Sequence, residues 1–385
     1  MHAKTLRVGI DTLFLDGRTR SSLANFVVEL TDGLVATADG ETFTLFVSPL
    51  TEKLFTHLAD RVELVRCAAG NDRVFQRILF QQFALPCLIR RHHIDVMCCL
   101  ADVAPVATAA PIVLKINTLH HYLTPSALGR ARAAYRRIMV KLSAMKARLV
   151  IANSRATADA VERLLRVPPA RLRLVYEAVD DVFAPIDDRT MLGARLAQRY
   201  GVSMPYLLFV SVLYPYKNLD VLIRAFARLR ESDDWNGQLV VAGSDPFDTR
   251  PSSEALATAL NLGDRVVFLG DVPQADLRDL YAGATAFVYP SASETFGKPI
   301  LEAMRCGTPV VASTAGSIPE IADGAALLFE PSDTGQLAVR LGQIIRDSAL
   351  RDRLQAAGFK RSADFNWGAV ARGFRSAIHE AAGNG

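Results

Sequence analysis

Short apolar runs alternate with amphipathic helical patterns along most of the first half of the chain. Seven of these runs have the character of strands, at residues 6–12, 42–48, 61–67, 95–100, 111–117, 148–154 and 171–179. Between the first two runs, one helical face is formed by Leu23, Phe26, Val27, Leu30 and Leu34. Because the runs are apolar almost throughout, they indicate a parallel sheet with helices on both faces.

A polar stretch broken by a proline, residues 180–190, separates this series from a second one. The second series has strand-like runs at residues 206–212, 238–244, 265–271, 285–291, 309–313 and 325–330, followed by helical patterns at 333–361 and 367–383. We therefore predict an α/β protein of two doubly wound, Rossmann-like domains, residues 1–185 and 186–365. Ligands are expected in the cleft between them, at the carboxyl ends of the strands. A last helix, residues 366–385, is expected to cross back to the first domain.

The composition is that of a globular protein, since half of the 385 residues are hydrophobic and 22% are charged. The five cysteines form no Cys-x-x-Cys pair, which is typical of reduced thiols in the cytoplasm. The first residues show no signal-peptide pattern, and no apolar run reaches the roughly 18 residues of a membrane span. We therefore expect a cytoplasmic protein.

The net charge of +4 is unevenly distributed. Residues 1–185 carry 24 Lys and Arg against 17 Asp and Glu, whereas residues 186–385 carry 20 against 23. A basic first half favours an anionic surface or partner on that side. No Gly-x-Gly-x-x-Gly motif follows a predicted strand, which argues against an oxidoreductase.

The stretch SASETFGKPILEAMRCGTPVVAS, residues 291–313, combines a loop glycine, a helix start and two carboxylates eight positions apart. Pro299 suits the first helical position, and Gly307 suits the stop beyond the last turn. The helix start offers N–H groups to an anion, and Glu302, expected in the first turn, can accept bonds from two neighbouring hydroxyls. The pattern fits a ligand with phosphate and diol groups. It also fits an ordinary helix start in which Glu302 complements the dipole and Glu294 is solvated.

The second half of the chain resembles the retaining GT-B glycosyltransferases of family 4. The matching stretches are residues 213–226, 266–291, 294–313 and 316–331, with weaker matches in the first half at 151–161 and 174–185. This resemblance implies two Rossmann-like domains that face a central cleft. It also implies transfer of a hexose, with mannose favoured, from a GDP- or UDP-linked donor during synthesis of a surface polysaccharide.

The resemblance also implies a mechanism. The acceptor attacks the face from which the nucleotide leaves, the departing phosphate takes its proton, and the anomeric configuration is retained. No metal and no other cofactor is expected, because the sequence has no Asp-x-Asp segment and the His120–His121 pair has no third ligand at metal spacing. The expected partners are the nucleotide sugar and a glycan or polyprenyl-linked acceptor, and no nucleic acid.

Site residues follow from the same resemblance. The catalytic residues would be His120, which faces the donor sugar, Lys217, which neutralises the diphosphate, and Glu294, which binds sugar hydroxyls. Glu302 would hold the ribose hydroxyls. The remaining donor-binding residues would be Ser21, Ser22, Phe268, Gly270, Phe296, Gly297 and Lys298, of which Phe268 and Gly270 would contact the base through the backbone.

Two positions depart from the family pattern. Val212 stands where an arginine is common, five residues before Lys217, and Ser21 and Ser22 stand where glycines are usual. Arg18 or Arg20 would then offset the lost charge. These departures leave two alternatives open: a catalytically degenerate GT-B module that binds sugar nucleotide without turnover, and a glycoside phosphorylase of the same fold.

Two segments of the first half bear on the acceptor. Residues 74–89 are apolar on most sides and are flanked by arginines. In a predicted helix at 125–147, an apolar stripe of Leu128, Ala131, Tyr135, Ile138, Leu142 and Met145 lies opposite Arg130, Arg137, Lys141 and Arg148. This arrangement fits peripheral contact with an anionic membrane on its inner face. It fits equally a solvated basic helix face beside a packed apolar one.

Overall fold

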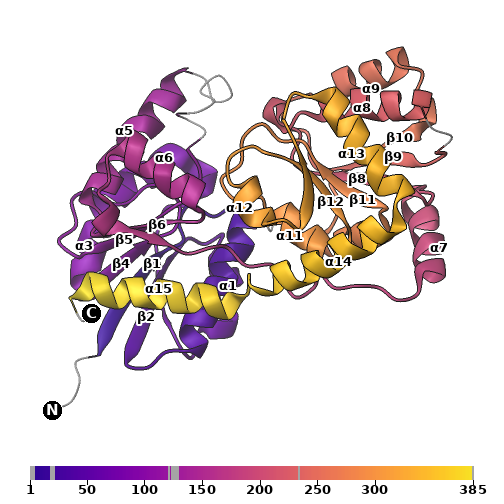
Figure 1. The fold of residues 1–385 in the computed structure, drawn as a ribbon. Helices are drawn as coiled ribbons and strands as arrows, with labels where there is room; N and C mark the ends of the chain where they lie inside the picture. Colours follow the sequence, from indigo (N-terminus) through magenta and orange to yellow (C-terminus); the bar gives the residue numbers. More distant parts are fainter. Residues whose placement is uncertain (1–4, 18–21, 120–121, 123–129, 233–234, 384–385) are drawn as a thin grey trace. The chain divides into compact units, whose positions relative to one another are not determined.

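The computed structural model describes residues 5–17, 22–119, 122, 130–232 and 235–383. The chain divides into two compact units, Met1–Glu177 with Trp367–Gly385, and Ala178–Asn366. Each unit is built on one parallel sheet (Figure 1). The prediction of two parallel, doubly wound α/β domains is therefore confirmed.

The sheet of the first unit has the strand order β3-β2-β1-β4-β5-β6-β7. Its strands are β1 (Leu6–Asp11), β2 (Glu41–Val47), β3 (Glu63–Arg66), β4 (Val96–Cys99), β5 (Ile112–Ile116), β6 (Leu149–Ala152) and β7 (Leu172–Leu174). Its helices are α1 (Ser22–Ala36), α2 (Val74–Leu79), the π-helix η4 (Phe80–Ala84), α3 (Leu85–Arg91), α5 (Arg130–Lys146), α6 (Arg155–Leu165) and α15 (Trp367–Ala382). The central strands β4, β5 and β6 are buried along their whole length, as expected for a sheet covered on both faces.

The sheet of the second unit has the order β10-β9-β8-β11-β12-β13. Its strands are β8 (Tyr206–Val210), β9 (Gln238–Ala242), β10 (Val266–Gly270), β11 (Ala286–Tyr289), β12 (Val310–Ser313) and β13 (Ala326–Phe329). Its helices are α7 (Arg189–Tyr200), α8 (Leu219–Ser232), α9 (Arg250–Ala259), α10 (Gln274–Gly283), α11 (Lys298–Arg305), α12 (Ile318–Ala322), α13 (Thr334–Arg346) and α14 (Ser348–Ala363), with a 3-10 turn, η7 (Pro215–Lys217). The direction of strand order changes between β8 and β11, and ligands of such sheets bind at this switch point.

The helical pattern at residues 333–361 forms two helices rather than one. The break lies at Asp347, whose side chain accepts a hydrogen bond from the backbone N of Leu350 at 2.9 Å. Aspartate in this role stabilises the start of a new helix, so α14 begins at Ser348.

The last helix, α15, packs beside α1 in the first unit (Figure 1). The ring of Phe26 lies 5.7 Å from that of Trp367. At the far end of the helix, Arg375 Nε and His379 Nε2 lie 2.5 and 2.6 Å from Glu41 Oε1. Burial acts to raise the pKa of Glu41, but the bonds from Arg375, His379 and the backbone N of Asp39 together outweigh it and lower the pKa to about 2.

The unit boundary lies earlier than the expected residue 185. Residues that follow Glu177 bond within the second unit: Val179 N donates to Phe365 O at 3.1 Å, and Arg278 Nε donates to Ala184 O at 3.1 Å. The polar stretch that indicated a linker is thus ordered by hydrogen bonds to the second unit.

No helix in the described ranges combines the length and the apolar character that crossing a membrane requires.

Candidate active site

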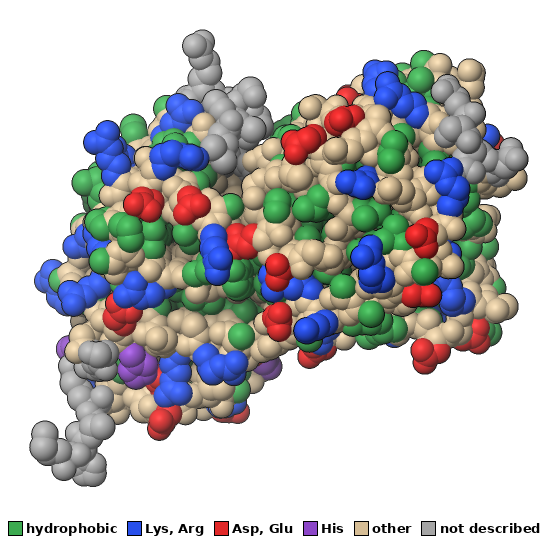
Figure 2. All heavy atoms as spheres, viewed as in Figure 1, with side chains coloured by type: hydrophobic (Ala, Val, Ile, Leu, Met, Phe, Trp, Pro, Cys, Tyr) green, Lys and Arg blue, Asp and Glu red, His purple; other side chains and the backbone are tan. Residues whose placement is uncertain are grey.

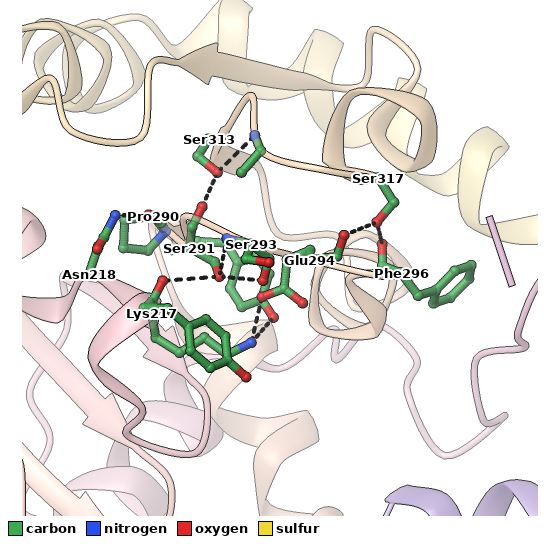
Figure 3. Close-up of polar contacts among 12 residues, drawn as sticks. Lys217, Asn218, Pro290, Ser291, Ser293, Glu294, Phe296, Ser313 and Ser317 are labelled. Carbon is green, nitrogen blue, oxygen red and sulfur yellow. Dashed lines mark hydrogen bonds and ion pairs between the residues drawn. The ribbon is translucent and has the colours of Figure 1, made fainter. Parts of the chain in front are cut away.

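Loops from three strands meet at the carboxyl edge of the second sheet. The turn η7 follows β8, residues 290–297 follow β11, and residues 314–317 follow β12. Since β11 pairs with both β8 and β12, these loops are neighbours although they are far apart in sequence. Figure 3 shows the polar contacts that join them.

Lys217 ends η7 and is 8% exposed. Its Nζ lies 2.5 Å from Glu294 Oε1 and donates to the hydroxyl of Tyr289 at 3.0 Å (Figure 3). The same nitrogen lies 5.2 Å from the ring centre of Tyr216. Burial first, and the nearby Glu294 carboxylate second, raise the pKa of Tyr289 well above its usual range, so this hydroxyl stays protonated. The cation therefore lies between one carboxylate and aromatic rings, with little water around it.

Asn218 fixes the position of the turn that carries Lys217. Its backbone adopts a left-handed conformation, with φ of 55°, which asparagine tolerates better than most residues. Its side-chain nitrogen donates to the carbonyl oxygens of Pro290 and Pro331, both at 3.1 Å. One side chain thus ties η7 to the segments that follow β11 and β13. Asn218 was not among the residues predicted from the sequence.

Buried serines hold the loop that carries Glu294. Ser313 Oγ donates to Ser291 O at 2.5 Å, and Ser317 Oγ donates to Phe296 O at 2.8 Å (Figure 3). The backbone N of Ser317 also donates to Glu294 O at 3.2 Å. The loop is therefore positioned by the segment after β12.

Glu302 lies one position past the first turn of α11, which begins at Lys298, so Pro299 is the second helical residue and not the first. The expectation that Glu302 complements the helix dipole from the first turn is wrong, because no acidic residue lies in that turn. Instead, Tyr281 donates its hydroxyl proton to Glu302 Oε2 at 3.0 Å. Burial raises the pKa of Glu302, although Lys298 and the Tyr281 bond act in the opposite direction.

Asp180 is a contact of Lys298 that the sequence did not reveal. Lys298 Nζ donates to Asp180 Oδ2 at 3.2 Å, and Gln274 donates to the same oxygen at 2.6 Å. Since Asp180 belongs to the polar stretch after the first sheet, its sequence context resembled a linker. The contact holds the first helical residue of α11 beside Glu302.

Other predicted residues of the second unit lie on neighbouring elements. Phe268 and Gly270 lie in β10, where the pairing with β9 is irregular between them. Gly297 precedes α11 with φ of 96°, a conformation that favours glycine. Val212 is 38% exposed in the loop after β8, so the place of the family's arginine is occupied by an uncharged surface residue.

Most of the site residues predicted in the first unit cannot be placed. Ser21, His120 and His121, with Arg18 and Arg20, lie outside the described residues. Ser22 begins α1. The predictions for these residues therefore stay predictions.

The segment that leads to His120 is held by Asp102. This buried carboxylate accepts hydrogen bonds from Asn117 N at 2.6 Å and from Arg136 Nη2 at 2.8 Å. Beneath it, the buried Lys115 pairs with Glu177 at 3.0 Å. The carboxyl edge of the first sheet thus carries a charged network that was not predicted from the sequence.

Comparison with models of known protein families identifies the family of this chain. A model described as "Glycosyl transferases group 1" matches residues 201–361, and one described as "Glycosyltransferase Family 4" matches residues 23–183. The chain belongs to the family 4, group 1 glycosyltransferases. Its resemblance to them, predicted from the sequence motifs, is confirmed.

Individual relatives agree with this assignment. O-antigen chain mannosyltransferase B of Escherichia coli is 29% identical over 259 residues, which cover 66% of each chain. Other curated relatives are matched over about half of their length.

Solved structures show the GT-B fold. Sucrose-phosphate synthase of Thermosynechococcus elongatus superposes with a TM-score of 0.75 at 22% identity, covering 97% of this chain and 98% of that one. HepE of Anabaena, solved in complex with UDP and glucose, has a TM-score of 0.73 at 21% identity, covering 97% and 100%.

Gly316 brings the serine segment close to Glu294, and replacing it by alanine is expected to displace the Glu294 loop and to weaken ligand binding at this edge of the sheet at least about tenfold. Its φ is 57°, and a Cβ atom there would lie 2.2 Å from the carbonyl oxygen of Glu294. The Glu294 loop would have to move. Calorimetric titration with a nucleoside diphosphate, GDP or UDP, measures this loss.

Gly324→Ala is the matched control for this prediction. Gly324 has φ of 79°, but a Cβ there meets nothing within 4 Å. It therefore carries the backbone strain of a left-handed alanine without the collision. Equal losses in the two variants would show that the contact with Glu294 is irrelevant to binding.

Proposed function

We propose that the protein transfers a hexose, with mannose favoured, from a GDP- or UDP-linked donor. The acceptor is a glycan or a lipid-linked precursor of a surface polysaccharide. The transfer retains the anomeric configuration and requires no metal ion. The observation that carries the proposal is the buried pair of Lys217 and Glu294 beside the start of α11. The 29% identity to an O-antigen mannosyltransferase supports the choice of sugar and pathway class. The fold shared with HepE, solved with UDP and glucose, supports a nucleotide-sugar donor.

The Lys217–Glu294 pair explains how the site would hold both ends of the reacting bond. Before the donor arrives, each charge compensates the other, so neither is buried alone. A nucleotide sugar offers phosphate oxygens to Lys217 and sugar hydroxyls to Glu294. Both charges would then retain a partner while the anomeric carbon lies between them.

Charge develops on the leaving phosphate during transfer. The Lys217 cation and the N–H groups at the start of α11 would stabilise this charge, and the phosphate would take the acceptor proton. His120 would contact the donor sugar from the first unit. Nothing in this scheme requires a second carboxylate as nucleophile, which separates it from the paired-carboxylate chemistry of glycoside hydrolases.

We also propose that the enzyme works in the cytoplasm, at the inner face of the membrane, where a polyprenyl-linked acceptor would be presented. Detection of the protein in membrane and cytosolic fractions of its host tests this location.

A thermal-shift panel of nucleoside diphosphates and nucleotide sugars, run with and without chelator, tests the donor assignment. At a ligand concentration of about 100 times Kd, binding stabilises the folded protein by about 2.7 kcal/mol. For domains of this size we expect a rise in Tm of about 5–10 °C with GDP or UDP, unchanged by chelator. A shift that chelator removes would overturn metal independence.

The outcome of the panel also separates the alternatives. Binding without turnover of any nucleotide sugar would favour the degenerate module, with Val212 as its first suspect. Turnover that consumes free phosphate in place of an acceptor would indicate a phosphorylase. NMR of the product's anomeric proton decides between retention and inversion.

A further inference from the structure

The segment α2–η4–α3 exposes a row of large apolar side chains. Phe75 is 73% exposed and Phe83 is 74% exposed, with Leu79 between them at 43%. Leu85 and Ile89 on the same segment are buried in the core of the first unit. The segment therefore has enough apolar residues to pack on the sheet and to present a second apolar face to solvent.

Helix α5 presents a similar row. Ile138, Leu142 and Met145 are 60%, 44% and 59% exposed. The residues by which α5 packs into the core are small, chiefly Val140 and Ala144, and are followed by the buried Ala147 directly after the helix. Of the apolar stripe predicted from the sequence, Ile138, Leu142 and Met145 are thus not the packed face of the helix, which argues against a solvated basic face beside a packed stripe over this part of α5.

The two rows lie on the same side of the first unit. Ala104 links them, because its carbonyl accepts from Gln82 Nε2 at 3.1 Å and its N donates to Ser143 Oγ at 2.9 Å. Gln82 belongs to η4 and Ser143 to α5. In Figure 2, hydrophobic and basic side chains lie side by side over the part of the first unit where Figure 1 labels α3 and α5.

Basic residues predominate on this surface. Neither residues 74–91 nor residues 130–146 contain an Asp or Glu, while six of the seventeen residues of α5 are Lys or Arg. Two cavities of about 1050 and 560 Å³, which share Ala109 and Ala110, run along the amino-terminal edge of the sheet below these helices. Their basic lining residues are Arg7, Arg90, His93, Lys146, Arg148 and Arg171, against the two acidic residues Asp95 and Glu380.

We propose that this surface, the docking face, binds an anionic lipid bilayer. The rows led by Phe75, Phe83 and Ile138 enter the boundary between head groups and acyl chains, and the cations along the two cavities contact lipid phosphates. A second copy of this chain is a poorer partner, since two like-charged faces would repel each other. A soluble polyanion would leave the apolar rows in water.

The docking face is independent of the donor site in the second unit. If the proposed transfer to a lipid-linked acceptor is correct, the docking face keeps the enzyme at the surface where that acceptor lies. Because vesicle binding requires no nucleotide, its failure and the failure of the proposed function are distinguishable.

Sedimentation of the full chain with vesicles tests the proposal. We expect binding to vesicles of phosphatidylglycerol and phosphatidylcholine, weakening as salt rises, and little binding to phosphatidylcholine alone. The double variant Phe75→Ser/Phe83→Ser should bind at least about tenfold more weakly. In the double variant Arg90→Gln/Lys146→Gln, each of the two substitutions should weaken vesicle binding about fivefold or more.

Met191→Ser/Val339→Ser is the matched control, because these side chains are 66% and 59% exposed on the second unit. It should bind vesicles like the unchanged protein. An equal loss in the control, or no binding to anionic vesicles by the unchanged protein, would overturn the proposal. So would a dimer in solution that the Phe75/Phe83 variant abolishes. Nucleotide-induced thermal shifts should be the same in every variant, which shows that each one is folded.

Discussion

Lys217→Ala is expected to lower kcat for sugar transfer by about 10²–10³-fold, with a smaller effect on donor affinity. Stabilisation of developing charge by one pre-positioned group is worth this much in other enzymes. Lys217 is suited to it, because it is buried and its Nζ is already oriented by Glu294 and the Tyr289 hydroxyl. Single-turnover rates with the donor identified by the thermal-shift panel measure the effect.

The control must separate catalysis from stability. Removing Lys217 leaves the Glu294 carboxylate, whose side chain is 9% exposed, without its ion-pair partner. This loss destabilises the fold, independently of any effect on catalysis. The double variant Lys217→Met/Glu294→Gln removes both charges and should recover most of the lost stability. Recovery of activity in the double variant would mean that Lys217 acts only by pairing with Glu294, and the catalytic assignment would fail.

The local part of the site was predictable from the sequence. Glu294, Gly297 and Glu302 lie within one short stretch, so their spacing alone indicated a loop, a helix start and two carboxylates. The contact between Lys217 and Glu294 was different, since 77 positions separate them. They meet because β11 pairs with β8, and only the family resemblance had linked them beforehand.

The residues that position the site were not predictable. Asn218 and Gly316 act through backbone conformation and through partners on other strands, which leave no pattern in their own neighbourhood. Asp180 lies in a polar stretch whose composition indicated only a linker. Such roles depend on the register and order of strands, which sequence periodicity does not specify.

Helix α5 shows a second limit of pattern analysis. An apolar stripe predicts a buried face, yet here the large residues Ile138 and Met145 are exposed while alanines such as Ala144 meet the sheet. Small residues allow a helix to approach its neighbours closely, and they contribute little to an apolar stripe. Periodicity placed Ile138, Leu142 and Met145 on one face, but it did not indicate that this face is exposed.

Glu302→Ala is expected to weaken binding of the nucleoside diphosphate about a hundredfold, because a carboxylate that accepts two ribose hydroxyls contributes about 1.5 kcal/mol or more through each bond. Calorimetric titration measures this directly. Since burial raises the pKa of Glu302, its protonation as pH falls should begin above the range of an ordinary glutamate, and affinity should fall with it.

A ligand change tests the same contact from the other side. The unchanged protein should bind a nucleoside diphosphate that lacks the 2′ and 3′ hydroxyls about a hundredfold more weakly than the complete one. Glu302→Ala should bind the two ligands with equal affinity, because the carboxylate and the hydroxyls are partners of each other, and removing either one already removes the contact. Tyr281→Phe is the control, since it removes only the bond that Tyr281 donates to Glu302 Oε2 and leaves the carboxylate in place. If removal of the two hydroxyls weakened binding as much in Glu302→Ala as in the unchanged protein, Glu302 would not contact the ribose. Its role would then be confined to holding α10 and α11 together through Tyr281.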